Sequence, residues 1–260
     1  MLPEEDILPL TPLRTLDARC ETCHRTRRIG IFISPPGMGK TTAIRAFAAR
    51  HPQNVTVITL NRKRVGSRDV LRHMVQAMWQ LRGHRGGHVH QQPHMLAQQL
   101  RYEIQQWYYD QRRHLGDLGP RLTVVFDEAQ YLAREALDEL RYWNDQPEQA
   151  VPVKVGLIFV GNHELSLKVD DEGRTVISRA VGDRARFIEA MEYSEITNDD
   201  LAMFARSRGV TDPEAIALIV RHFSAPRASR SLRRVGDFID DAAEYACGQP
   251  INAEIILAMV

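Results

Sequence analysis

The chain has 260 residues, of which 43% are hydrophobic and 26% are charged, and its formal net charge is only +1. This is the composition of a globular protein in water, and the length suffices for one large domain or a medium domain with a small one. No apolar run approaches the roughly 18 residues that a membrane span needs, and the N-terminal segment MLPEEDILPL is acidic where a signal peptide is basic, so we expect a cytoplasmic protein with no membrane partner.

Most of the chain alternates short apolar runs with amphipathic segments. The short, β-branched runs predict buried strands, and apolar residues at helical spacing predict helices. In the helix predicted over 67–81, for example, Val70, Met74 and Met78 fall on one face, and Ser67 is placed to cap the start. The predicted strands are 29–33, 55–60, 122–126, 155–160 and 187–191, and the predicted helices are 13–28, 40–50, 67–81, 94–114 and 134–143.

The pattern becomes wholly helical near the end of the chain. The helices predicted there are 198–208, 212–223, 231–246 and 252–259. Strands that alternate with helices indicate a parallel sheet flanked by helices, and a helical tail indicates a small appended bundle. We therefore predict an α/β domain over residues 1–192 and a small helical domain over residues 193–260.

The cysteines do not predict a disulfide framework, because there are only three: Cys20, Cys23 and Cys247. The segment Cys20-x-x-Cys23-His24 resembles half of a zinc site, but no second ligand pair completes the four ligands that tetrahedral zinc needs. We interpret Cys20 and Cys23 as helical residues that are packed or half exposed.

The segment SPPGMGKT, which begins at Ser34, lies between a predicted strand and a predicted helix. It matches G-x-x-x-x-G-K-[ST] except that Ser34 replaces the first glycine. Gly37 and Gly39 allow backbone N–H groups to face phosphates, and the positive end of the following helix adds to this attraction. In such a loop Lys40 neutralises the β- and γ-phosphates of ATP, and the Thr41 hydroxyl binds Mg²⁺. The residues expected to hold the nucleotide are Pro36, Gly37, Met38, Gly39, Lys40, Thr41 and Thr42.

A second motif is the apolar strand predicted over 122–126, which ends in the acids Asp127 and Glu128. The carboxyl ends of parallel strands meet at one edge of a sheet, so we expect Asp127 beside the phosphate loop. There Asp127 would hold Mg²⁺, directly or through water, and Glu128 would polarise the attacking water. The alternative, a solvated acidic helix start, is weaker because these acids follow a phosphate loop.

Several segments together resemble the AAA+ ATPases, and within them the transposition regulators of the phage Mu B protein and TnsC/TniB class. The segments are IGIFISPPGMGKTTAIRAF, LTVVFDEAQYL, LIFVGNHEL, VISRAVGDRARF and ASRSLRRVGDFIDDA, within about residues 29–245. The resemblance implies an AAA+ core, a C-terminal helical lid, ATP hydrolysis, and self-assembly into a ring or a helical filament.

The resemblance also implies roles for residues outside the two motifs. Asn162 would be the sensor that reads the γ-phosphate or the attacking water, although a turn residue at a strand end is the alternative. Arg179, and after it Arg184, would be the arginine finger that reaches the neighbouring subunit's nucleotide, with Arg186 as a third candidate. Arg233 would be a second sensor at the start of a lid helix, where the alternative is a basic helix face.

A regulator of this class must hold double-stranded DNA through its phosphates. Basic residues cluster after the strand predicted over 55–60, and no base-reading module is recognisable, so binding should be largely independent of sequence. Such clusters are often only solvated loops. A histidine-rich loop over 84–94 is too flexible to preform a metal site and is expected to order on contact with DNA or protein. The candidate DNA-binding residues are Arg62, Lys63, Arg64 and Arg68.

The function implied is an ATP-dependent regulator that assembles on target DNA and recruits or activates a transposase, with or without a targeting adaptor. ATP would act as a switch, favouring assembly until hydrolysis releases it. One alternative is a secretion ATPase that resembles ExeA, a type that usually adds a membrane span and a peptidoglycan-binding part. Another is a replication initiator or helicase loader, which normally adds a DNA-reading domain for which 260 residues leave no room.

Overall fold

The computed structural model describes residues 8–61, 64–84, 86–112, 120–145, 154–167, 177–225 and 228–260. The chain divides into two compact units. The sheet unit comprises Asp17–Ile33 and Ile44–Ala190, and the lid unit comprises Met1–Leu16, Ser34–Ala43 and Met191–Val260.

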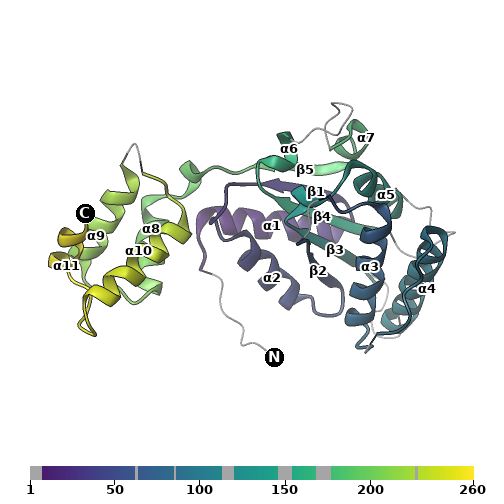
Figure 1. Cartoon of the computed structure of the whole chain (residues 1–260), viewed down its shortest axis with the longest axis horizontal. Helices are drawn as coiled ribbons and strands as arrows, with labels where there is room; N and C mark the ends of the chain where they lie inside the picture. Colours follow the sequence, from purple (N-terminus) through teal and green to yellow (C-terminus); the bar gives the residue numbers. More distant parts are fainter. Residues whose placement is uncertain are drawn as a thin grey trace. The chain divides into compact units, whose positions relative to one another are not determined.

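The sheet unit is built on a parallel sheet with the strand order β2-β3-β4-β1-β5 (Figure 1). Strands β1, β3 and β4 are buried along their whole length, as expected for central strands that are covered on both faces. This confirms the predicted α/β class. The strand bounds are Ile29–Ile33 (β1), Val55–Thr59 (β2), Leu122–Asp127 (β3), Val155–Gly161 (β4) and Ala185–Ala190 (β5).

One face of the sheet is covered by α3 (Ser67–Leu81) and α5 (Arg134–Asp145), and α4 (Pro93–Arg112) packs on α3 (Figure 1). Alternate residues of the strands point into this layer, among them Phe126 of β3 and Phe159 of β4. Their rings are stacked with centroids 5.5 Å apart. Because side chains alternate along a strand, the neighbours of Phe126 point to the opposite face.

That opposite face receives α1 (Thr11–Thr26), whose second half belongs to the sheet unit. A Cβ atom on Gly30 would lie 2.7 Å from the Cys23 sulfur, so the glycine in β1 allows α1 to approach closely. Cys20 and Cys23 are 1% and 0% exposed, which confirms the interpretation of packed helical cysteines.

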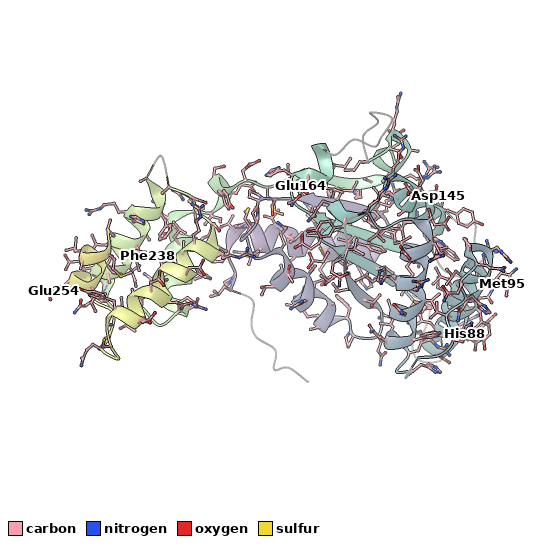
Figure 2. The ribbon with its side chains drawn as sticks, in the orientation of Figure 1. His88, Met95, Asp145, Glu164, Phe238 and Glu254 are labelled. Atoms are coloured by element: carbon pink, nitrogen blue, oxygen red, sulfur yellow. The ribbon has the colours of Figure 1, made fainter. Side chains whose placement is uncertain are left out.

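The lid unit contains a bundle whose helices begin at well-formed caps. The side chains of Thr197, Asp212 and Asn252 each accept a hydrogen bond from a backbone N–H in the first turn of the helix that follows. Half-buried Phe238, labelled in Figure 2, stacks on half-buried His222 with ring centroids 5.4 Å apart. The helices are α8 (Asn198–Ser207), α9 (Pro213–Ser224), α10 (Leu232–Tyr245) and α11 (Ala253–Met259).

Some local predictions were wrong. The N-cap of α3 is Gly66, and the Ser67 hydroxyl instead donates to the carbonyl of Glu135 at 2.9 Å. Four short elements had no periodicity by which to be recognised: η1 (Ala129–Tyr131), α6 (Glu164–Leu167), α7 (Arg179–Gly182) and η2 (Tyr193–Glu195). Within the residues that the structure describes, no helix is long and apolar enough to cross a membrane. Nor does any group of three or more His, Cys, Asp or Glu side chains among these residues lie where it could hold a metal ion.

Candidate nucleotide site

The phosphate loop joins the end of β1 to the start of α2 (Lys40–Arg50). Gly37 and Gly39 have φ values of 79° and 87°, in the left-handed region where a side chain is strained, so both positions require glycine. Ser34 does not adopt a positive φ. The serine that replaces the first glycine of the motif is therefore compatible with the backbone of the loop.

Lys40 is held inside this loop. Its Nζ donates hydrogen bonds to the carbonyl oxygens of Ser34 at 2.8 Å and Pro35 at 2.9 Å. The ammonium group is thus oriented by the backbone of the loop itself, which reduces the entropy that a phosphate ligand must overcome to engage it.

The loop also contacts the helical bundle within the lid unit. The backbone N–H of Arg233, in the first turn of α10, donates to the Gly37 carbonyl at 3.3 Å, and the hydroxyl of Tyr193 donates to the Pro36 carbonyl at 2.6 Å. A Cβ atom on Gly37 would lie 2.4 Å from the Ser231 hydroxyl oxygen. The loop and the first turn of α10 are therefore in direct contact, and the side chain of Arg233 is exposed beside it.

The acidic motif lies at the carboxyl end of β3, within the sheet unit. Asp127 is 1% exposed, and its Oδ1 accepts the N–H of Glu128 at 3.0 Å. Glu128 has φ 57° and ψ 40°, an uncommon left-handed conformation for a residue with a side chain. Strain of this kind persists only where the surrounding structure holds it, and it concentrates at functional sites.

Gln130 holds the Glu128 side chain. The Gln130 Nε2 donates to Glu128 Oε2 at 2.6 Å, and the Gln130 Oε1 accepts the backbone N–H of Asn162 at 3.2 Å. The sequence reasoning missed Gln130. The signal was present, since a polar residue in the otherwise apolar stretch AQYL has to find partners if it is buried.

Asn162 directly follows β4. Its Oδ1 accepts the N–H of Glu164 at 2.9 Å and so caps the short helix α6, which is the behaviour expected of a turn residue. A role in sensing the γ-phosphate would therefore depend on the amide nitrogen of Asn162.

The profile of a family described as "AAA domain" matches residues 23–169, which is more than half of the chain and includes both motifs. The chain belongs to the AAA domain family. The family match and the two motifs within it support hydrolysis of ATP with Mg²⁺. A search of curated protein sequences found no match.

Solved structures share the fold of this AAA domain. Cdc6p from Pyrobaculum aerophilum is 14% identical, with a TM-score of 0.60, and the match covers 91% of this chain and 61% of that one. The ORC2 protein of Aeropyrum pernix, solved as ADPNP and ADP complexes, is 15% identical, with a TM-score of 0.59 and coverage of 95% and 65%. Drosophila ORC bound to DNA is 16% identical, with a TM-score of 0.53 and coverage of 95% and 58%. The chain thus spans less than two thirds of the length of these relatives.

The residues of the AAA domain fit a magnesium nucleotide. Lys40 would bind phosphate oxygens. The positive φ angles of Gly37 and Gly39 give the loop the sharp turn that a phosphate-binding loop needs just before the start of α2. The Thr41 hydroxyl and the Asp127 carboxylate are each hard oxygen ligands of the kind that Mg²⁺ prefers. When bound, the metal neutralises charge on the transferring phosphoryl group.

The candidate finger arginines differ in how they are held. The side chain of Arg179 is 96% exposed, and its Nε lies 4.0 Å from the Asp183 carboxylate. Arg184 donates from Nε to Asp145 at 2.6 Å; Figure 2 labels Asp145, at the end of α5. The third candidate, Arg186, has its guanidinium 5.8 Å from the centroid of the adjacent Phe187 ring. The side chain of Arg179 is therefore almost entirely open to solvent.

The candidate DNA-binding residues are only partly described. Arg62 and Lys63 lie outside the described residues. Arg64 and Arg68 are exposed, and Arg64 has φ 62°. Arg64 lines a hollow of about 570 Å³, together with Arg72 of α3 and other polar residues.

The histidine-rich loop leads into α4. Figure 2 labels His88 in this loop and Met95 in the first turn of α4. The rings of His88 and His90 lie edge to face, with centroids 5.4 Å apart, and the backbone carbonyl of His88 accepts a hydrogen bond from Gln99 at 2.9 Å. This part of the loop is therefore anchored to α4.

Proposed function

We propose that this protein is an ATP-dependent DNA-binding switch that assembles on duplex DNA and there recruits or activates a transposase. The AAA domain supplies the ATPase. The transposase is proposed because the motifs resemble those of the transposition regulators.

The basic hollow at the end of β2 is the observation that supports DNA binding. β2 is an edge strand of the sheet. The hollow is lined by Arg64, Arg72 and His73, and Arg68 lies exposed on the same helix as the last two. Among the described residues of the lining Asp69 is the one acid, and it lies 3.6 Å from Arg72, so the described positive charge exceeds the negative charge there. Cationic groups around a hollow of this size suit the phosphates of a nucleic acid backbone.

In the proposed cycle Lys40 and Thr41 bind the nucleotide, Glu128 orients the attacking water, and Arg179 completes the site of a neighbouring subunit. Binding of ATP would favour assembly, because Arg179 of one subunit would contact the γ-phosphate of the ATP that a neighbouring subunit binds. Hydrolysis would remove that difference in contacts and release the assembly.

A replication initiator or helicase loader is a second candidate, because the fold is shared with Cdc6p and with ORC. The two functions can be compared on one preparation of the protein bound to duplex DNA with ATP. The proposal expects transposase strand transfer to be directed to that DNA, whereas the second candidate expects loading of a replicative helicase.

The DNA surface can be tested by reversing charge with Arg64→Glu and Arg68→Glu together. Each lost phosphate contact should reduce the slope of log affinity against log salt concentration by about 0.9, for every DNA sequence. Fluorescence anisotropy with a labelled duplex between low and physiological salt measures this slope.

Arg25→Glu with Arg112→Glu is the matched control, because both residues are exposed and lie on other helices of the sheet unit. If the Arg64 and Arg68 reversal leaves the slope as in the wild type, this surface does not hold DNA. The basic segment 221–234 of the lid unit would then be the next candidate.

A further inference from the structure

Gln130 is a buried polar side chain between two strand ends. It is 2% exposed and lies in η1, shortly after the end of β3. Its amide reaches the Glu128 carboxylate on one side and the backbone of Asn162, directly after β4, on the other. The two partners are far apart in the sequence and are joined through one side chain.

The chemistry of the partners determines how the amide is oriented. The backbone N–H of Asn162 can only donate, so the oxygen of Gln130 must face it. The amide nitrogen must then face Glu128, and a donor is what an ionised carboxylate accepts. Reversing the amide would place a donor against a donor and an acceptor against an acceptor.

The surroundings leave Gln130 little freedom. A Cβ atom on Gly161, the last residue of β4, would lie 2.9 Å from the Gln130 Oε1 and 3.3 Å from the Gln130 backbone nitrogen. Glycine at this strand end therefore makes room for the amide. At the other end, the left-handed backbone of Glu128 directs its carboxylate toward Gln130.

We propose that Gln130 is a positioning residue for hydrolysis, which holds the Glu128 carboxylate in place and ties it to the strand end that carries Asn162. The proposal rests on the role given to Glu128 in the proposed function. Gln130 acts through Glu128 and not on the nucleotide. Its loss should slow turnover and leave ATP binding intact.

Gln130→Met tests the proposal, because methionine has a similar length and no hydrogen-bonding amide. We expect kcat to fall about tenfold or more, since a small misplacement of a catalytic group has effects of this size or larger. The affinity for a fluorescent ATP analogue should stay within about twofold of the wild type, because the Lys40 ammonium is oriented by the carbonyls of its own loop, at Ser34 and Pro35. Gln98→Met, on the exposed face of α4, is the matched control.

Gln130→Glu provides an independent readout. Two carboxylates at hydrogen-bond distance cannot both be ionised and so share a proton. The acidic limb of the pH–rate profile should therefore move to higher pH, and activity should recover as pH rises. A residue that only supports the fold would not move this limb. Gln98→Glu adds the same charge at an exposed position.

Glu128→Gln, measured in parallel, separates this inference from the role on which it rests. Glu128→Gln should lose turnover and keep nucleotide binding. If it does so while Gln130→Met keeps the wild-type kcat, Gln130 does not position Glu128, and the proposed function stands. Loss of nucleotide binding in Gln130→Met, with an unmoved pH–rate profile in Gln130→Glu, shows a structural role and also overturns the inference. Wild-type turnover in Glu128→Gln removes the role of Glu128, and with it that of Gln130.

Discussion

At the scale of single residues, the three cysteines differ in reactivity because they differ in burial. Burial raises the pKa of the Cys23 thiol to about 12 and that of Cys20 well above its usual range. Cys247 is exposed. Because the thiolate is the reactive form, Cys20 and Cys23 should be inert in the folded protein.

We therefore expect a disulfide reagent such as DTNB to modify one thiol rapidly in the native protein and all three after unfolding. Absorbance of the released thiolate measures the number. In Cys247→Ser the rapid phase should vanish, whereas Cys23→Ser should retain it. Rapid modification of two or more thiols in the wild type would contradict the packing of α1 against β1.

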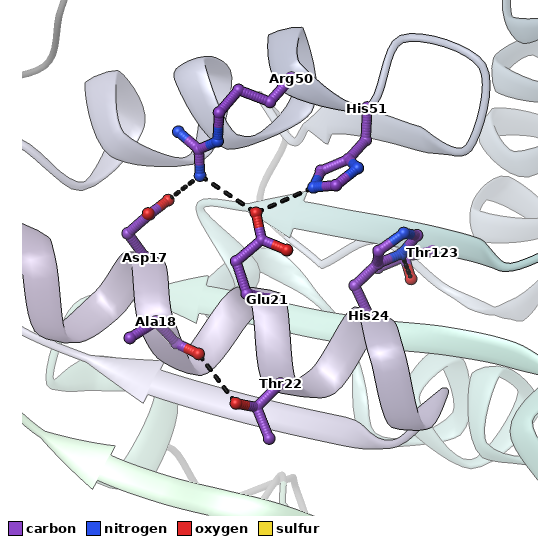
Figure 3. A network of polar contacts seen from close by, with 8 residues as sticks. All are labelled: Asp17, Ala18, Glu21, Thr22, His24, Arg50, His51 and Thr123. Carbon is purple, nitrogen blue, oxygen red and sulfur yellow. Dashed lines mark hydrogen bonds and ion pairs between the residues drawn. The ribbon is translucent and has the colours of Figure 1, made fainter.

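At the scale of elements, α1 is joined to the end of α2 and to β3 by polar contacts (Figure 3). The Nε2 of His51 lies 2.9 Å from Glu21 Oε1, and the Nδ1 of buried His24 lies 2.9 Å from the Thr123 hydroxyl. Arg50 pairs with Asp17 and also bonds Glu21. These contacts attach α1 to the sheet unit by more than apolar packing.

The same contacts make stability depend on pH. Burial lowers the pKa of His24 from 6.5 to about 4, and nearby His51 adds to the effect. Burial opposes ionisation of Glu21, but hydrogen bonds from His51 and Arg50 outweigh it and lower the pKa of Glu21. Both groups bind protons more readily in the unfolded chain, so the free energy of unfolding must fall as pH falls.

For His24 this loss should develop as pH is lowered from about 6.5 to about 4 and amount to about 3 kcal/mol. Urea unfolding followed by circular dichroism over this range measures it. In His24→Gln the loss of stability with falling pH should be smaller by about that amount, and His94→Gln at an exposed position is the matched control. An equal pH dependence in wild type and His24→Gln would show that His24 is not buried in its neutral form.

At the scale of the whole molecule, the exposed Arg179 can act as an arginine finger, as proposed, only if another subunit supplies a nucleotide. We expect specific ATPase activity to rise with protein concentration, and DNA to enhance the rise by bringing subunits together. Arg179→Ala should bind ATP normally yet lose hydrolysis and ATP-dependent assembly. Mixing it with Lys40→Ala should restore some turnover, because each variant supplies what the other lacks.

Steady-state hydrolysis over a wide concentration range, with sedimentation velocity in the presence of ATP and duplex DNA, measures both effects. Arg184 provides a comparison, because its partner Asp145 lies in the same subunit. If the ion pair of Arg184 and Asp145 only stabilises the subunit, Asp145→Ala should change hydrolysis and assembly as Arg184→Ala does. Constant specific activity and monomers under all conditions would exclude a shared site.

The sequence by itself determined the α/β class and both nucleotide motifs, because these depend on order along the chain. SPPGMGKT lies between an apolar strand and a helix, and LTVVFDE is a buried strand that ends in acids. The positive φ angles of Gly37 and Gly39 follow from the motif alone. Periodicity also placed the longer helices, whose ends differ from the predictions by only a few residues.

Only the tertiary structure decided which polar side chains meet. Sequence separations of 32 positions for Gln130 and Asn162, 39 for Arg184 and Asp145 and 157 for Tyr193 and Pro36 leave no periodic trace. Such contacts depend on which strands are neighbours in the sheet and on how the helices pack. A hydrogen bond between distant residues needs a particular geometry, whereas apolar burial needs only a pattern, and so the pattern could be read from the sequence and the bonds could not.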